Sequence, residues 1–184
     1  MEILSASNAK NIAEYAHYWG LFVIIFRVYS HIMKIIDDTD REILRILQSD
    51  STTSLEAIAE KLSVSVNTCW RRVRRLEDDG IIQGRVAICD PEKLGFGQTV
   101  FVAIKTNDHS SAWLTKFAKT VAKIPEVVEF YRMAGDVDYL LKVAVRSVAD
   151  YDRVYKALIA KMEVADVSAT FAMECLKNTT ELPV

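Results

Sequence analysis

Four arginines occupy five consecutive positions around one valine, in the stretch RRVRR at residues 71–75. A guanidinium group carries a permanent charge and a planar fork of donors, which pairs with phosphate oxygens or with the edge of guanine. The 184-residue chain has a formal net charge of -2, so this positive patch is local. It is typical of a confined docking surface for a polyanion, although a solvated helix face paired with the acids at 77–79 would have the same composition. The four residues are Arg71, Arg72, Arg74 and Arg75.

Three predicted helices position these arginines. Apolar residues recur at helical spacing in three short stretches, the first after the cap-competent segment DDTD and the second after Thr53 and Glu56, which have capping-box spacing. Only the link SVS separates the second stretch from the third, so these two helices must cross at a steep angle. This order predicts a helix-turn-helix DNA-binding domain over residues 34–80, in which Gly80 ends the third helix. The apolar positions are Ile43, Leu44 and Leu47, then Leu55, Ile58, Ala59 and Leu62, then Val66, Cys69, Trp70, Val73 and Leu76.

The third helix is predicted to face a DNA groove. We expect Trp70, Val73 and Leu76 to form its buried stripe, with the arginines on the far side and Arg72 on the flank. At its start stand Ser65, Asn67 and Thr68, which supply short hydrogen-bonding groups where such helices meet base edges. For Ser65 a simple N-cap role is an equally good interpretation.

The second half of the chain predicts a different architecture. A strand-containing linker at 81–98, with a strand over 81–88, leads into the order strand, helix, strand, strand, helix, strand over 99–178. This βαββαβ order predicts an α+β chain whose C-terminal half is a ferredoxin-like unit, with both helices on one face of an antiparallel sheet. Residues 179–184 are expected to form a C-terminal tail. The predicted strands cover 99–106, 127–133, 139–146 and 167–175, and the helices between them carry apolar residues from Trp113 to Val121 and from Tyr151 to Met162.

The first and third of these strands are apolar on both faces. Phe101 and Ala103 alternate with valines and an isoleucine in one, and Leu140 and Ala144 alternate with apolar neighbours in the other. A sheet with helices on one side only should be polar on its open face if that face met water. We therefore expect a second copy of the sheet to cover it in a homodimer, which would prefer near-palindromic DNA sites spaced by whole helical turns.

The remaining features predict neither a metal or cofactor site nor membrane insertion. The three cysteines lie far apart without CxxC spacing, which argues against disulfides or zinc and fits a cytoplasmic protein. The apolar stretch from Trp19 to Met33 is interrupted by Arg27 and is too short to span a bilayer, although a membrane-surface helix is an alternative. We assign no function to the extension at 1–33. The cysteines are Cys69, Cys89 and Cys175.

Three stretches together resemble the leucine-responsive regulatory protein/AsnC (Lrp/AsnC) family of transcription regulators. They are DDTDREILRILQSDSTTSLEAIAEKLSVSVNTCWRRVRRLEDDGIIQG from Asp37, AGDVDYLLKV from Ala134 and FAMECLKNTTELPV from Phe171. The resemblance covers about residues 35–184. It implies a winged-helix-like helix-turn-helix domain, a ferredoxin-like effector domain, and dimers that often assemble into octamers.

The resemblance also implies which residues bind DNA and a small molecule, usually an amino acid. The DNA-binding segment of the family maps to residues 54–73, which brings in Ser54. The effector loop Gly-Asp-x-Asp maps to Gly135, Asp136 and Asp138, where a carboxylate could pair with the ammonium group of an amino acid. Ordinary hairpin chemistry is an equally good reason for Gly-Asp between two strands.

Two other functions are compatible with the same architecture. One is an enzyme resembling the siroheme decarboxylases, whose chemistry depends on histidine and arginine in the effector domain. Here the histidines are His17, His31 and His109, and we find no acid-base pair beside them. The other is an architectural DNA-binding protein without a ligand. The basic third helix favours a regulator over the enzyme.

Overall fold

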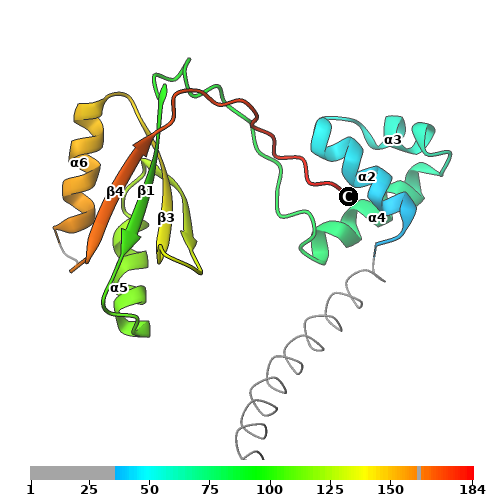
Figure 1. Cartoon of the computed structure of the whole chain (residues 1–184). Coiled ribbons are helices and arrows are strands. Elements are labelled where there is room, and N and C mark those ends of the chain that lie inside the picture. The colour runs from blue at the N-terminus through cyan, green and yellow to red at the C-terminus, as the bar shows by residue number, and fades with distance from the viewer. Residues whose placement is uncertain (1–35, 161–162) are drawn as a thin grey trace, which may run out of the picture. The chain divides into compact units, whose positions relative to one another are not determined.

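The computed structural model describes residues 36–160 and 163–184, which belong to two compact units (Figure 1). Unit 1 consists of the chain up to Val86 together with the C-terminal residues Thr179–Val184. Unit 2 is the segment between them, from Ala87 to Asn178. The predicted extension at 1–33 lies outside the described residues. Among the described residues, no helix has the length and apolar character needed to cross a bilayer.

The described part of unit 1 is a bundle of three helices. They are α2 (Asp38–Ser49), α3 (Leu55–Lys61) and α4 (Val66–Asp78). Gly80 follows α4 with φ at 71°, a left-handed conformation that glycine adopts without strain, and it ends the helix where the sequence predicts. The helices bury a small apolar core made of Ile43, Leu44, Leu47, Ile58, Ala59, Cys69, Val73 and Leu76.

A side chain caps the start of α2, of α3 and of α4. Asp37 and Asp40 form a reciprocal capping box at α2, as the acidic segment before that helix suggests. The predicted box of Thr53 with Glu56 is wrong by one residue, because Ser54 is the N-cap of α3 and accepts a hydrogen bond from the backbone N–H of Ala57 at 3.2 Å. The hydroxyl of Thr53 instead donates to a backbone carbonyl in the preceding turn.

The predicted strand over 81–88 is absent. Residues 83–90 have no regular secondary structure, and the side chains of Val86 and Ile88 are exposed. An alternating apolar pattern makes a strand only where a neighbouring strand accepts its backbone hydrogen bonds. In the described part of the chain, the sheet order includes no partner for this segment.

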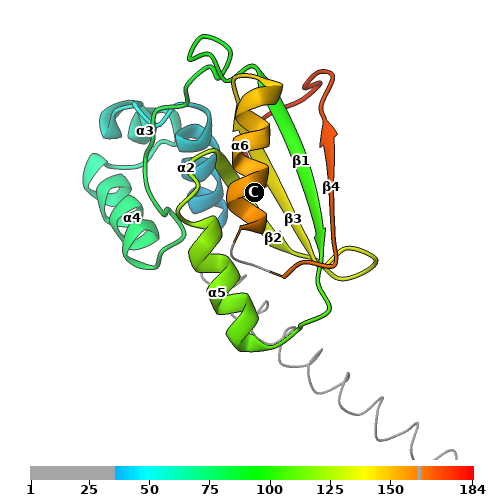
Figure 2. The same cartoon turned by 90° about the vertical axis from the view of Figure 1, so that its left-hand side faces the viewer.

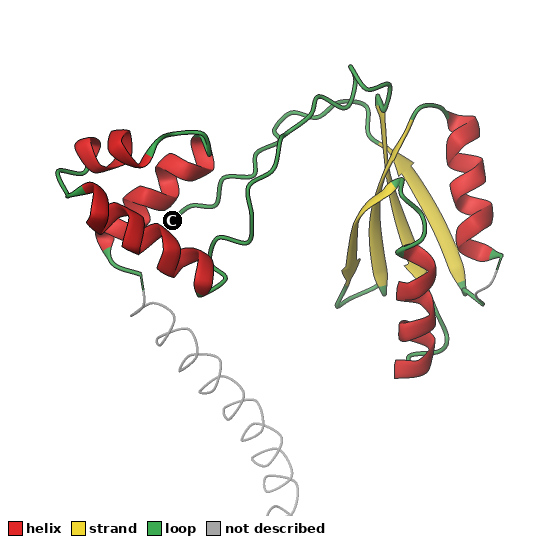
Figure 3. Cartoon of the chain, turned by 180° about the vertical axis from the view of Figure 1, so that it is seen from behind, coloured by secondary structure: helices red, strands yellow, loops and turns green. Residues whose placement is uncertain are grey.

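Unit 2 has the predicted βαββαβ order. Its antiparallel sheet has the strand order β2-β3-β1-β4, and α5 and α6 cover one face of it (Figures 2 and 3). This is the ferredoxin-like arrangement. The last strand ends at Phe171, four positions before the predicted end at 175, so the chain leaves the sheet early. The elements are β1 (Gln98–Lys105), α5 (Ser111–Val121), β2 (Val127–Arg132), β3 (Tyr139–Val145), α6 (Val148–Ile159) and β4 (Asp166–Phe171).

The two faces of this sheet differ in burial. On the helix face, β1 and β3 bury alternate residues against Trp113, Phe117 and the other apolar side chains of the two helices. On the opposite face, Phe101 of β1 lies beside Lys142 of β3 and keeps 39% of its surface exposed. That face, which the sequence predicts to be covered by a second copy, is open in the single chain.

Candidate nucleic-acid interface

The start of α4 is held by its own side chains. Ser65 is the N-cap and accepts a hydrogen bond from the backbone N–H of Thr68 at 3.1 Å, while the two hydroxyl groups lie 2.8 Å apart. Ser65 and Thr68 are thus engaged in capping, as Ser54 is at α3. Asn67 is exposed in the first turn of α4, beside the unsatisfied N–H groups of the helix start, where a phosphate oxygen would be stabilised.

The prediction that Trp70 anchors α4 in the core is wrong. Its side chain keeps 52% of its surface exposed, whereas Cys69, Val73 and Leu76 are buried. The predicted stripe, with Trp70 before Val73 and Leu76, and the observed one, with Cys69 in its place, both have helical spacing, so the pattern alone does not distinguish them. The packing of α2 and α3 selected the stripe that begins one residue earlier. The indole therefore lies outside, one turn before Arg74 on the same face of the helix.

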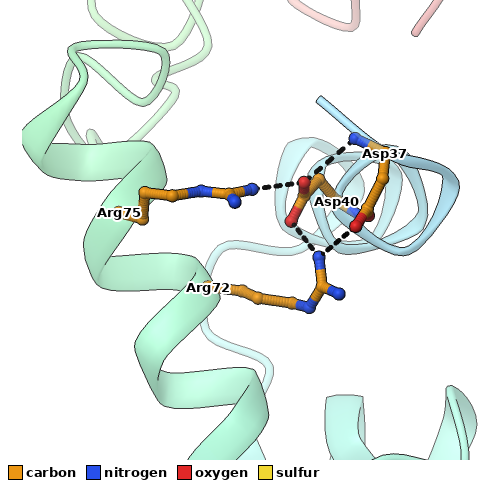
Figure 4. A network of polar contacts seen from close by, with 4 residues as sticks. All are labelled: Asp37, Asp40, Arg72 and Arg75. Atoms are coloured by element: carbon orange, nitrogen blue, oxygen red, sulfur yellow. Dashed lines mark hydrogen bonds and ion pairs between the residues drawn. The ribbon is translucent and has the colours of Figure 1, made fainter. Parts of the chain in front are cut away.

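Two of the four arginines are turned toward the protein itself. Arg72 Nη1 donates to Asp40 Oδ1 at 2.9 Å and to Asp37 Oδ2 at 2.6 Å, and Arg75 Nη2 donates to Asp40 Oδ2 (Figure 4). The prediction that Arg75 lies on the far side of α4 is therefore wrong, and Arg72, predicted on the flank, also points toward the start of α2. We call Asp37, Asp40, Arg72 and Arg75 the acid–arginine cluster.

The burial of Asp40 explains this arrangement. Its side chain is fully buried, so its charge requires partners, and each of its oxygens receives one guanidinium group. The hydrogen bond from Arg72 lowers the pKa of Asp37 below its ordinary value, and the hydrogen bonds to Asp37 and Asp40 raise the pKa of Arg72. The cluster joins the first turn of α2 to the middle of α4.

The other two arginines are exposed. Arg71 makes no ion pair or hydrogen bond with any residue in the described part of the chain. Nη1 of Arg74 lies 3.7 Å from Oε2 of Glu77, and its Nη2 lies 4.0 Å from Oδ1 of Asp78. Both ion pairs are open to solvent. Exposed pairs of this kind contribute little and exchange readily for a phosphate partner. Arg71 and Arg74, with Asn67 and Trp70, are thus exposed α4 side chains that a ligand can reach.

The sequence carries a signal for the acid–arginine cluster that apolar periodicity does not contain. Asp37 and Asp40 are three residues apart, as are Arg72 and Arg75, so each pair lies on one face of its own helix. As helix caps, the two acids would act within α2 alone. Matching i,i+3 spacing shows which side chains could pair, whereas the packing of α2 on α4 decides that they do.

The predicted effector loop is the connection between β2 and β3. Its backbone closes through a hydrogen bond from Met133 N–H to the carbonyl of Asp138 at 2.8 Å. Gly135 has φ at 133°, a conformation that side chains disfavour, and Asp136 is exposed. Asp138 Oδ2 accepts a hydrogen bond from the backbone N–H of Thr106 at 2.9 Å, and Asp138 Oδ1 lies 3.7 Å from His109 Nδ1. The carboxylate of Asp138 thus fastens the residue that follows β1, while the exposed carboxylate of Asp136 has no partner among the described residues.

Comparisons with known proteins identify the domain family of each unit. Residues 36–83 match the winged helix-turn-helix DNA-binding domain, and residues 99–182 match the Lrp/AsnC ligand binding domain. A glutamate uptake regulatory protein of Zymomonas mobilis is 51% identical over 149 residues, which are 81% of this chain and 91% of that protein. The DNA-binding transcriptional activator DecR of Escherichia coli is 49% identical over 150 residues, 81% of this chain and 99% of that one.

Solved structures agree with these matches. An AsnC family transcriptional regulator from Agrobacterium tumefaciens superposes with a TM-score of 0.78 at 55% identity, covering 80% of this chain and 97% of that one. A transcriptional regulator from Neisseria meningitidis, in complex with L-Met, superposes with a TM-score of 0.75 at 30% identity, covering 80% of this chain and 96% of that one.

Proposed function

Since this chain belongs to the Lrp/AsnC family of transcriptional regulators, we propose that α4 reads DNA through its exposed side chains and that an amino acid bound by unit 2 tunes this binding. As a family member the chain is a DNA-binding transcriptional regulator with a ligand-binding domain. Its relatives are named as regulators, and the alternative of a siroheme decarboxylase-like enzyme has no support among them.

The exposure of Arg71 and Arg74 is the observation that carries the DNA-binding proposal. Both guanidinium groups lie on the helix that the helix-turn-helix fold inserts into the major groove, and the intrachain partners of Arg74 are weakly held. Asn67 and Trp70 extend the same surface toward the start of the helix. We assign Ser54, Ser65 and Thr68 to the helix starts, whose backbone N–H groups approach phosphates. Arg72 and Arg75 support α4 through Asp40.

For the small molecule we propose the β2–β3 loop as one wall of the site. The free carboxylate of Asp136 would pair with an ammonium group, and the backbone at Gly135 would allow close approach of the ligand. The related regulator from Neisseria meningitidis was crystallised with L-Met, which favours an amino acid here. Asp138 would support the loop through Thr106.

The proposed assembly is a homodimer formed through the open sheet face, with octamers built from such dimers as in the family. Exposed Phe101 on that face supports this arrangement, because an exposed aromatic side chain is stabilised by a matching surface, and the neighbouring Lys142–Glu129 pair adds polar groups that a second copy could meet. A dimer presents two α4 helices to two half-sites of a near-palindromic DNA sequence. A regulator of chromosomal genes is expected in the cytoplasm.

One titration tests the function as a whole. We expect the full chain to bind a labelled fragment from upstream of its own gene more tightly than a fragment of scrambled sequence, as measured by fluorescence anisotropy. One of the twenty amino acids should change that affinity. Equal affinity for both fragments and no response to any amino acid would indicate an architectural DNA-binding protein instead.

A further inference from the structure

The C-terminal segment packs with the DNA-binding helices. Residues 179–184 belong to unit 1, although the chain between Val86 and Thr179 forms unit 2. Figures 1 and 3 show the C-terminal end of the chain beside the helices of unit 1. Unit 1 is therefore joined to unit 2 by two covalent connections, one before β1 and one after β4.

A single side chain holds the backbone of this segment. Gln48, near the end of α2, donates from Nε2 to the carbonyl of Leu182 at 3.2 Å and accepts at Oε1 from the Leu182 backbone N–H at 2.7 Å. The amide group thus pairs with both backbone groups of one residue, as a neighbouring strand would. Such pairing recognises extended backbone.

Apolar contact and local turns complete the docking. Val184 packs against the buried core of unit 1. The backbone N–H of Glu181 donates to the hydroxyl of Thr179 at 3.1 Å, and that of Val184 donates to the carbonyl of Leu182 at 2.9 Å. Pro183 restricts the backbone between the two anchored residues. The segment is thus shaped for its site but held by few contacts.

Few contacts are sufficient because the segment is tethered. A segment joined to its site by a short chain has an effective concentration on the order of millimolar, so weak docking is largely occupied and easily reversed. The tether here consists of residues 87–97 before β1 and residues 172–178 after β4, and β4 pairs with β1 in the sheet of unit 2. A change in that sheet therefore reaches the segment directly along the chain.

Helix α2 connects the segment to the DNA-reading helix. Gln48 lies near its C-terminal end, and Asp40, which holds Arg72 and Arg75 of α4, lies in its first turn. A helix is rigid over this length, so docking at one end constrains the acid–arginine cluster at the other.

We propose that residues 179–184 are a strap that docks on Gln48 of α2 and, through α2 and Asp40, holds α4 in its DNA-binding orientation, so that unit 2 regulates DNA affinity by tightening or releasing it. This proposal rests on the proposed function of α4.

Gln48→Ala in the full chain tests the strap. We expect hydrogen exchange at the Leu182 amide, followed by mass spectrometry of C-terminal peptides, to become about tenfold faster, because two hydrogen bonds are lost. The affinity for the upstream DNA fragment should fall by a similar factor. Arg45→Ala is the matched control: Arg45 is exposed on the same helix and pairs with Glu42, so it should change neither quantity.

A second variant separates docking from misfolding. Deletion of residues 179–184 should weaken DNA binding, and a synthetic peptide NTTELPV, added at about millimolar concentration, should restore it. Rapid exchange of the Leu182 amide in the unmodified chain would overturn docking. Faster exchange in Gln48→Ala with unchanged DNA affinity would overturn the coupling. If the unmodified chain bound no DNA, the proposed function would fail, while the exchange experiment would still report on docking.

Discussion

Nη1 of Arg72 in α4 lies 2.9 Å from Oδ1 of Asp40 in α2. The carboxylate is fully buried, and it also binds Arg75, so two positive side chains of α4 neutralise one negative side chain of α2. Two of the four arginines, Arg72 and Arg75, thus hold α4 in position, whereas Arg71 and Arg74 have no partner on α2.

Asp40→Ala should destabilise unit 1 by about 3 kcal/mol, because it removes the buried partner of two guanidinium groups and half of the capping box. DNA affinity should fall with it, although Asp40 itself is buried. Urea unfolding and anisotropy titrations measure the two effects. Asp38→Ala, which removes an exposed acid from the same turn, should lower the free energy of unfolding by well under half of that amount.

Arg71→Ala and Arg74→Ala should weaken DNA binding while leaving the melting temperature nearly unchanged, since both side chains are exposed. Each loss of a phosphate contact should reduce the slope of log affinity against log salt by about one. Lys93→Ala removes the same charge from unit 2 and should leave the slope unaltered. An undiminished slope in the Arg71 and Arg74 variants would mean that other groups contact the DNA.

Trp70→Ala should cost less than about 1 kcal/mol in the free energy of unfolding, because the indole is half exposed. Leu76→Ala, on the buried side of the same helix, should cost about 3 kcal/mol. If Trp70 contacts DNA as proposed, its variant should nevertheless bind the upstream fragment less tightly. Equal unfolding free energies for the two variants would contradict the observed orientation of α4.

The lowered pKa of Asp37 predicts how the stability of unit 1 changes with pH. Its pKa is lowered in the folded protein, chiefly by the hydrogen bond from Arg72, so the unfolded chain binds the proton more readily. The stabilisation is therefore complete above the unfolded pKa of about 4 and is lost as pH falls through the lower folded pKa. The free energy of unfolding of unit 1, measured across this acidic range, should depend less steeply on pH in the Asp37→Asn variant than in the unmodified chain.

A parallel measurement in unit 2 is the control. The pKa of Glu126 is also lowered, first by its hydrogen bond from Arg153. Glu126→Gln should therefore flatten the acid dependence of unit 2 and leave that of unit 1 as it was. If Asp37→Asn had no effect on unit 1, the Arg72 contact would not favour the charged carboxylate.

Phe101→Asp should convert the proposed dimer to a monomer in light-scattering measurements, because it places a charge at the centre of the open sheet face. Val148→Asp is the matched substitution elsewhere: Val148 is exposed at the start of α6, where a carboxylate is tolerated. A Phe101→Asp variant that remained dimeric would show that copies associate through another surface.

Local patterns predicted much of this protein. Helical spacing, capping residues and the βαββαβ order were sufficient for both units, because they reflect backbone preferences and burial that act within one element or between chain neighbours. The same signals placed the end of α4 at Gly80 and selected α4 as the basic helix.

What only the tertiary structure decided is which partner each side chain meets. Trp70 is exposed and Cys69 buried because of how α2 and α3 pack on α4, and periodicity allows either. Residues 81–88 form no strand within the described chain because none of its strands accepts their hydrogen bonds. Arg72 reaches Asp37, and Leu182 reaches Gln48, across separations that no local pattern encodes. Such contacts depend on the balance of burial and charge in the assembled fold, and so they emerge only when distant segments are brought together.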